Sequence, residues 1–210
     1  MVKGPTWTDE GIEETVAVNH LSHLALLDAL RDRGNAPSVV VFIGSATHDP
    51  ERWTGTPSPD ESAITQLAFG SARKGSRQQG MTRYTTTKLM AVATAAALAR
   101  EQPDSWIVAF DPGLMLDTRL GRQHPLVLRA LYRSFLRGVR LLPFASTSQA
   151  SGVRLAELLL GSATVPSGSC LDHRLRPQRP STRALDRDYQ NTLLADSRQI
   201  ITEALREVPC

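Results

Sequence analysis

A tyrosine and a lysine four residues apart, Tyr84 and Lys88, have a spacing that suggests chemistry. They lie at the head of RYTTTKLMAV, a stretch that otherwise predicts an ordinary helix. On a helix, side chains four residues apart project from the same face. A nearby ammonium favours the tyrosinate, so Lys88 should lower the pKa of Tyr84 from its reference value of about 10. Such a tyrosine suits general acid/base catalysis, although the pair alone is also typical of a helix surface.

Three further sites lie within or at the ends of predicted elements. Asn19 falls in a helix predicted over residues 8–34, with a threonine at its start as N-cap. Ser45 ends SVVVFIGS, a continuous β-branched run typical of a strand buried on both faces. Pro112-Gly113 ends SWIVAFDPG, a second strand of the same kind. Taken singly, these residues fit a polar core position, a cap and a turn.

The remaining segments complete an α/β pattern. The polar stretch 46–83 predicts a long loop with a short helix near 60–69, followed by a helix over 85–101. Further helices are predicted over 124–142, 146–161 and 189–207, a short strand over 167–175, and a Pro- and Arg-rich linker over 174–187. This alternation predicts a doubly wound parallel sheet with flanking helices, which places ligands at the carboxyl ends of its strands. We expect one domain over 1–176, then a linker and C-terminal helix over 177–210.

Taken together and in this order, the four sites resemble the short-chain dehydrogenase/reductase family. The matching segments are VNHLSH, VVVFIGSATH, YTTTK and DPGLMLDT, which fall within residues 8–175. The long interval between Ser45 and Tyr84 and the segments AVNHL and DPGLM are similar to the branch that contains retinol dehydrogenases and protochlorophyllide-type reductases. The resemblance implies a Rossmann-like fold and interconversion of a carbonyl and an alcohol with a nicotinamide cofactor, NADP or NAD.

The resemblance also implies a role for each matched residue. Tyr84 would be the general acid/base, and Ser45 would hydrogen-bond the same reacting oxygen. Asn19 would keep a water chain to Lys88, while Tyr84 and Lys88 would contact the cofactor at its nicotinamide ribose. The residues that would border the nicotinamide, its carboxamide or the phosphates are Pro112, Gly113, Leu114 and Thr118.

The sequence departs from the family in one respect. It contains no Thr-Gly-x-x-x-Gly-x-Gly motif, whose backbone approaches the cofactor pyrophosphate, and no Asn-Asn-Ala-Gly segment before the first helix. We therefore expect a truncated Rossmann-like sheet whose open edge is covered by a homo-oligomer or by a complementing chain. Three explanations stay open: a fragment of a longer reductase, a natural short form, or an enzyme that has abandoned redox chemistry.

Two other functions stay open beside carbonyl reduction. The same pocket could perform cofactor-independent acid/base chemistry, such as cyclisation, dehydration or isomerisation of a small-molecule substrate. Alternatively, the chain could be a non-catalytic partner of a full-length reductase. The ordered set of four sites favours an enzyme, because no structural need joins these residue types.

Composition argues against several other classes. The chain has 41% hydrophobic and 21% charged residues and a net charge of +3, which is ordinary for a globular protein. It shows neither a transmembrane stretch nor a signal peptide, and its two cysteines and its histidines lack metal-ligand spacing. We expect a cytoplasmic protein. An arginine-rich, carboxylate-free stretch over 119–156 predicts a solvated basic face or, alternatively, a surface for an acidic substrate or membrane; no nucleic-acid motif accompanies it.

Overall fold

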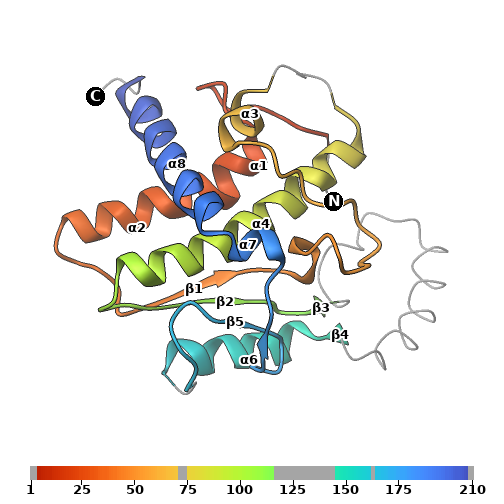
Figure 1. Ribbon diagram of the computed structural model, residues 1–210, viewed down its shortest axis with the longest axis vertical. Helices are drawn as coiled ribbons and strands as arrows, with labels where there is room; N and C mark the ends of the chain where they lie inside the picture. The colour runs from red at the N-terminus through yellow and green to blue at the C-terminus, as the bar shows by residue number, and fades with distance from the viewer. Residues whose placement is uncertain (1–3, 71–74, 116–144, 162–163, 208–210) are drawn as a thin grey trace.

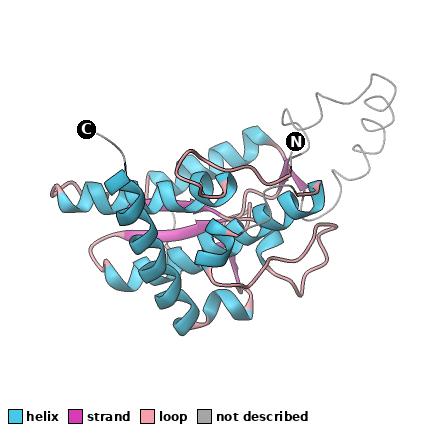
Figure 2. Cartoon of the chain, turned by 90° about the horizontal axis from the view of Figure 1, so that it is seen from above, coloured by secondary structure: helices cyan, strands magenta, loops and turns pink. Residues whose placement is uncertain are grey.

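A short, mostly parallel sheet lies at the centre of the structure, a computed structural model that describes residues 4–70, 75–115, 145–161 and 164–207. Its strands, in spatial order, are β1 (Val39–Ile43), β2 (Trp106–Phe110), β5 (Cys170–Leu171) and β6 (Pro177–Gln178). β1, β2 and β5 are parallel, and β6 is antiparallel to β5. Helices flank both faces of the sheet (Figures 1 and 2). The predicted α/β class, a parallel sheet between helices, is confirmed.

The carboxyl ends of β1 and β2 lie at the same level. Their register pairs Val39 with Trp106 and Ile43 with Phe110, so the two apolar strands run side by side over their whole length. One residue further, the Gly44 N–H donates to the Phe110 carbonyl over 2.8 Å. The residues that follow the two strands therefore meet at one edge of the sheet, where a ligand of a parallel sheet binds.

The long helix α4 (Arg77–Glu101) packs across one face of this sheet. It begins eight residues before the predicted start at 85, because Ser76 and Gln79 form a capping box that satisfies two free N–H groups. Its central turns bury mainly small side chains, which let the helix approach β1 and β2 closely; they include Ala91, Ala93, Ala95 and Ala97. The polar segment before α4 contains the 3-10 turn η2 (Ala46–His48) and α3 (Ile64–Phe69).

The first helical region is shorter than predicted and changes pitch within itself. It consists of α1 (Glu14–Val16), the π-helical turn η1 (Ala17–Leu21) and α2 (Ser22–Asp32). Its N-cap is Glu13 and not Thr8, because residues 8–12 form a tight turn that is closed by a bond from the Thr8 N–H to the Ile12 carbonyl. The predicted N-cap at Thr8 is therefore wrong, whereas the predicted helix itself exists.

The C-terminal third wraps back over the sheet. The predicted helix over 146–161 is α6 (Ser148–Leu159), on the face opposite α4 (Figure 1). The segment expected as a linker is partly regular, because β6 pairs with β5 and α7 (Thr182–Leu185) follows. The last helix, α8 (Arg187–Glu207), packs on α4 and α2. The predicted helix over 124–142 lies outside the described residues. No helix within the described ranges combines the length and apolarity that a membrane crossing requires.

Arg198 of α8 fastens three helices together. Its guanidinium donates to both carboxylate oxygens of Asp28 in α2, at 2.9 and 3.2 Å, and to Glu101 at the end of α4, at 2.9 and 3.3 Å. A planar guanidinium suits such paired carboxylates, because its donors form a fixed fork. These bonds hold α8 against the face of α4 that lies away from the sheet.

Buried His20 should make the stability of the fold depend on pH. His20 is 3% exposed, and its Nε2 is 2.7 Å from the Ser197 hydroxyl, which itself donates to the Leu193 carbonyl. Burial, and secondarily the charge of His23, lowers the pKa of His20 to about 4. Between pH values of about 6.5 and about 4, His20 is protonated in the unfolded chain but not in the folded one. The free energy of unfolding therefore falls as the pH falls through this window.

We expect the free energy of unfolding to decrease by about 3 kcal/mol through His20 as the pH falls from about 6.5 to about 4. Urea denaturation at several pH values measures the slope, and His20→Gln is the control because it can still donate to Ser197 without titrating. An identical pH slope in the variant and the parent chain would show that His20 has no such effect.

Candidate active site

Lys88 joins the helix that carries Tyr84 to the end of the sheet. The Lys88 Nζ donates to the carbonyl of Ile43, the last residue of β1, over 2.9 Å. The same ammonium lies 5.4 Å from the centre of the Tyr84 ring. Both side chains are half-buried, and the charge of Asp111, which follows β2, acts on both of them. The predicted same-face arrangement of the pair is present.

Asn19 lies beside the turn of α4 that carries this pair. The π-helical turn η1 contains Asn19, and π turns within helices often occur at functional sites. The Asn19 Nδ2 donates to the Thr87 hydroxyl over 3.3 Å, and that hydroxyl donates to the Tyr84 carbonyl over 2.8 Å. Asn19 is thus two hydrogen bonds from the backbone of Tyr84.

Ser45 is fixed by its backbone and by the turn that it caps. It follows Gly44 after β1 and has an extended conformation, with φ of −169°. Its hydroxyl accepts the Thr47 N–H over 3.3 Å and so caps η2. The turn η2 packs against α4, which brings the Ser45 segment to the helix that carries Tyr84.

The Pro112-Gly113 turn follows β2 at the same edge of the sheet. Gly113 has φ of 75°, the left-handed region that favours glycine, and its N–H donates to the Asp111 Oδ1 over 2.9 Å. The Pro112 carbonyl accepts the Ser151 hydroxyl of α6 over 2.7 Å. Leu114 begins β3 (Leu114–Met115), which pairs in parallel with β4 (Ala145–Ser146). Thr118 lies outside the described residues.

The pKa of Tyr84 shifts in the direction opposite to the prediction. Burial raises the pKa of Tyr84 above its ordinary value, and the charge of Asp111 raises it further. Burial also lowers the pKa of Lys88, and the charge of Asp111 partly opposes this shift. The predicted lowering of the tyrosine pKa by the ammonium is therefore wrong for this structure. The cause is burial of Tyr84, reinforced by the charge of Asp111, while the ammonium bonds the Ile43 carbonyl. Tyr84 is protonated at neutral pH.

Asp111 is the site residue that the sequence reasoning missed. It follows β2 directly and is only 9% exposed, a burial that is unusual for a carboxylate. One oxygen accepts the Gly113 N–H, and its charge acts on several titratable neighbours: Tyr84, Lys88, His48 and Cys170. The available signal was its position immediately before Pro112-Gly113, at the carboxyl end of a buried strand.

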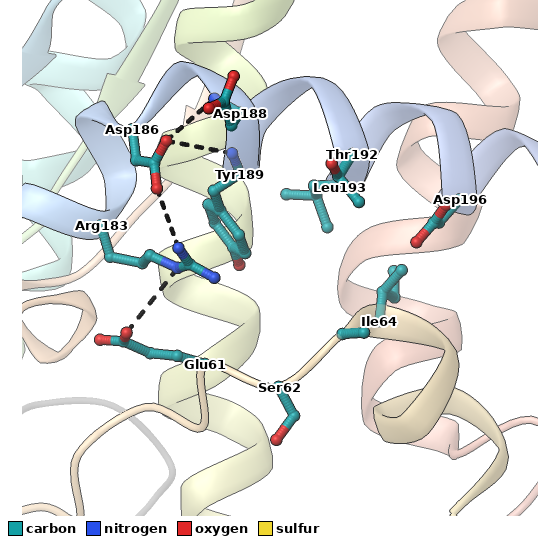
Figure 3. A pocket seen from close by; sticks show the side chains of 11 residues that line it. Glu61, Ser62, Ile64, Arg183, Asp186, Asp188, Tyr189, Thr192, Leu193 and Asp196 are labelled. Atoms are coloured by element: carbon teal, nitrogen blue, oxygen red, sulfur yellow. Dashed lines mark hydrogen bonds and ion pairs between the residues drawn. The ribbon is translucent and has the colours of Figure 1, made fainter.

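A cavity of about 270 Å³ lies elsewhere in the molecule, between the segment at 61–64 and helices α7 and α8 (Figure 3). Arg183 in its wall pairs with Asp186 at 2.9 Å, faces Glu61 at 3.8 Å and stacks on Tyr189 at 4.4 Å. None of the four residues Asn19, Ser45, Tyr84 and Lys88 lines it. Among the described residues, no three His, Cys, Asp or Glu side chains are grouped to hold a metal ion.

The comparisons with known proteins point to reductases. No family model matches the chain. The chain is 29% identical over 181 residues to "Protochlorophyllide reductase A, chloroplastic" of Triticum aestivum, and the match covers 78% of this chain and 46% of the relative. It is also 29% identical to the protochlorophyllide reductase of Avena sativa, of which it covers 57%. The chain thus spans about half the length of the curated relatives it matches. The resemblance to this reductase branch is confirmed.

A solved structure supports the fold. An uncharacterised protein from Mycobacterium paratuberculosis superimposes with a TM-score of 0.61 and 23% sequence identity. The match covers 96% of this chain and 63% of that chain. At this identity the likeness supports the Rossmann-like arrangement alone and carries no information on the reaction.

Replacing Asp111 with Asn should lower the pKa of Tyr84. The amide removes the negative charge that disfavours the tyrosinate, while its oxygen can still accept the Gly113 N–H. NMR titration of tyrosine Cζ carbons measures the pKa, with Tyr84→Phe to assign the signal. Asp49→Asn is the matched control, because Asp49 does not act on Tyr84. A Tyr84 pKa that is unchanged or higher in Asp111→Asn would contradict this account of the site.

Proposed function

We propose that this chain is an oxidoreductase that interconverts a carbonyl and an alcohol with NADP or NAD, with Tyr84 as the general acid/base. The observation that carries the proposal is the contact between the Tyr84/Lys88 pair and the end of β1, beside Ser45 and the Pro112-Gly113 turn. The relationship to protochlorophyllide reductases supports a redox reaction. The same relationship favours a small-molecule substrate.

The residues at this edge fit the nicotinamide end of such a cofactor. An ammonium has three donors, and one Lys88 donor binds Ile43, which leaves two for the ribose hydroxyls. Ile43 at the end of β1 and Leu114 at the start of β3 are 40% and 47% exposed and offer apolar surface to a flat ring. Pro112 and Gly113 would border that ring. Thr118, which lies outside the described residues, would contact the carboxamide or the phosphates. When bound, the cofactor supplies or accepts the hydride.

The chain's own residues would handle the proton. In the reductive direction, Tyr84 Oη donates a proton to the oxygen that gains negative charge, and its raised pKa keeps that proton in place beforehand. The Ser45 hydroxyl donates a hydrogen bond to the same oxygen. Lys88 is the cation beside the tyrosinate that remains, and Asn19 holds the Thr87 hydroxyl that supports this turn of α4. A water on Asn19 would relay a proton to Lys88.

A second candidate function is acid/base chemistry without a cofactor, such as isomerisation or dehydration. The specific observation in its favour is Asp111, a buried carboxylate whose charge acts on Tyr84. Two titratable groups held close together in different environments are a common arrangement for an acid and a base. Cofactor binding separates this function from the redox proposal.

Titration with NADPH and NADH, followed by nicotinamide fluorescence, should show saturable binding below millimolar concentration. Menadione and isatin then serve as carbonyl probes for turnover. Tyr84→Phe should weaken cofactor binding about two- to tenfold, since it removes one hydroxyl contact to the ribose, and should reduce kcat by about 100-fold or more, since it removes the acid. Lys88→Met should weaken cofactor binding about tenfold, because it removes a charged donor. Absence of binding at millimolar cofactor would overturn the redox proposal.

We further propose that the outer edge of β1 is completed by another strand, from a second copy or a complementing chain. Within the described residues β1 pairs with β2 alone, so its outer backbone groups have no strand partner. The first helical region also exposes two hydrophobic side chains, Val18 in η1 and Leu26 in α2. Free strand edges and exposed apolar faces both favour association.

Light scattering should therefore give a solution mass of at least twice the chain mass of 22.9 kDa. Val39→Lys should shift the protein toward the monomer, because a charge on an edge strand opposes pairing. A parent chain that stays monomeric at high concentration would contradict self-association through this edge.

A further inference from the structure

His48 is buried at the junction between the candidate site and the C-terminal segment. It is the last residue of η2, three residues after Ser45, and it is 1% exposed. Nothing in the proposed reaction uses it, yet a buried imidazole requires partners for its polar atoms. η2 packs against α4, and α7 packs against α4 as well, so three elements meet around this ring.

The hydrogen bonds of His48 determine its protonation. The Ser45 carbonyl lies 2.7 Å from Nδ1 and can only accept, so Nδ1 carries a proton. The Ser181 backbone N–H lies 3.2 Å from Nε2 and can only donate, so Nε2 carries a lone pair. The ring is therefore the neutral Nδ1–H tautomer. A proton on Nε2 would face the Ser181 N–H, and this contact would be lost.

These bonds fix the orientation of the Ser45 turn. The Ser45 carbonyl accepts both the His48 ring N–H and the His48 backbone N–H, the latter over 3.1 Å. On the other side, Ser181 is 3% exposed and caps α7 by accepting the Ala184 N–H. The imidazole thus ties a turn that follows β1 to a segment more than a hundred residues later in the chain.

The surroundings of His48 have opposing effects on its pKa, and the net effect favours the neutral ring. Burial lowers the pKa of His48, while the bond to the Ser45 carbonyl and the charges of Asp49 and Asp111 act in the opposite direction. Arg52, on the same segment, favours the neutral ring. The His48 ring therefore gains a second proton only at a pH below the usual range of histidine, and both of its hydrogen bonds are present at neutral pH.

We propose that His48, as the neutral Nδ1–H tautomer, is a positioning residue: its Nδ1–H bond to the Ser45 carbonyl holds Ser45 in place for the reacting oxygen, and the Ser181 N–H completes the bridge by keeping the ring in that tautomer. This role rests on the proposed function, in which Ser45 donates to that oxygen. A side chain displaced by about 1 Å from a reacting group can cost about 100-fold in rate, so the orientation of the turn matters.

Two single substitutions separate the two bonds. In His48→Asn, the amide ends where Nδ1 lies and can still donate to the Ser45 carbonyl, but it does not reach Ser181. In His48→Gln, the amide ends near Nε2 and can still accept the Ser181 N–H, but it loses the bond to Ser45. With NADPH and menadione, His48→Asn should keep kcat within about threefold, and His48→Gln should lower it about 10- to 100-fold. Both should leave the cofactor Kd within about twofold. Equal losses of kcat in the two variants would overturn the positioning role.

Two measurements need no turnover and remain decisive if the redox proposal fails. Long-range ¹H–¹⁵N NMR of the five histidines should show His48 with Nδ1 protonated and Nε2 bare at neutral pH. Amide exchange at Thr47, whose N–H binds the Ser45 hydroxyl, should be about tenfold faster in His48→Gln and unchanged in His48→Asn. An Nε2–H tautomer, or equal Thr47 exchange in all three proteins, would refute the bridge. An intact bridge without turnover would refute only the reaction.

Discussion

The hydrogen bond from Lys88 Nζ to the Ile43 carbonyl is the contact on which the candidate site depends. It joins the middle of α4 to the last residue of β1, and so sets the distance between Tyr84 and the strand edge. The in-register end of β1 and β2 then brings Asp111 close enough for its charge to act on the same ammonium. A shift of α4 along the sheet would separate the tyrosine from the turns that would hold its substrate.

Much of the fold could be predicted from local patterns. The β-branched runs ending in Ser45 and Asp111 predicted two buried parallel strands, and alanine-rich 85–101 predicted the helix that crosses them. The errors have local physical causes. A turn closed by the Thr8 N–H displaced the first N-cap, and the capping box at Ser76 extended α4 into the predicted loop. β6 was missed because two residues that pair with β5 leave no periodic pattern.

The sequence predicted which residues meet at the candidate site better than it predicted their pKa shifts. Four-residue spacing was enough to place Tyr84 and Lys88 together, because helix geometry fixes it. The direction of the tyrosine pKa was not predictable, since it depends on burial and on Asp111, which is distant in sequence. From the sequence, His48 was only excluded as a metal ligand, because its partners Ser45 and Ser181 become visible only in three dimensions. Contacts of this kind leave no signature in sequence spacing.

The central claim is that Tyr84 is the acid of a nicotinamide-dependent site, and one measurement tests it directly. The chain has three tyrosines, so the Cζ carbon signal of each can be followed while NADPH is added. The account predicts that the Tyr84 signal moves in a saturable manner and that its pKa changes with the bound cofactor, while the buried Tyr189 does not respond. A Tyr84 signal and pKa that are unaffected by millimolar NADPH would contradict the account.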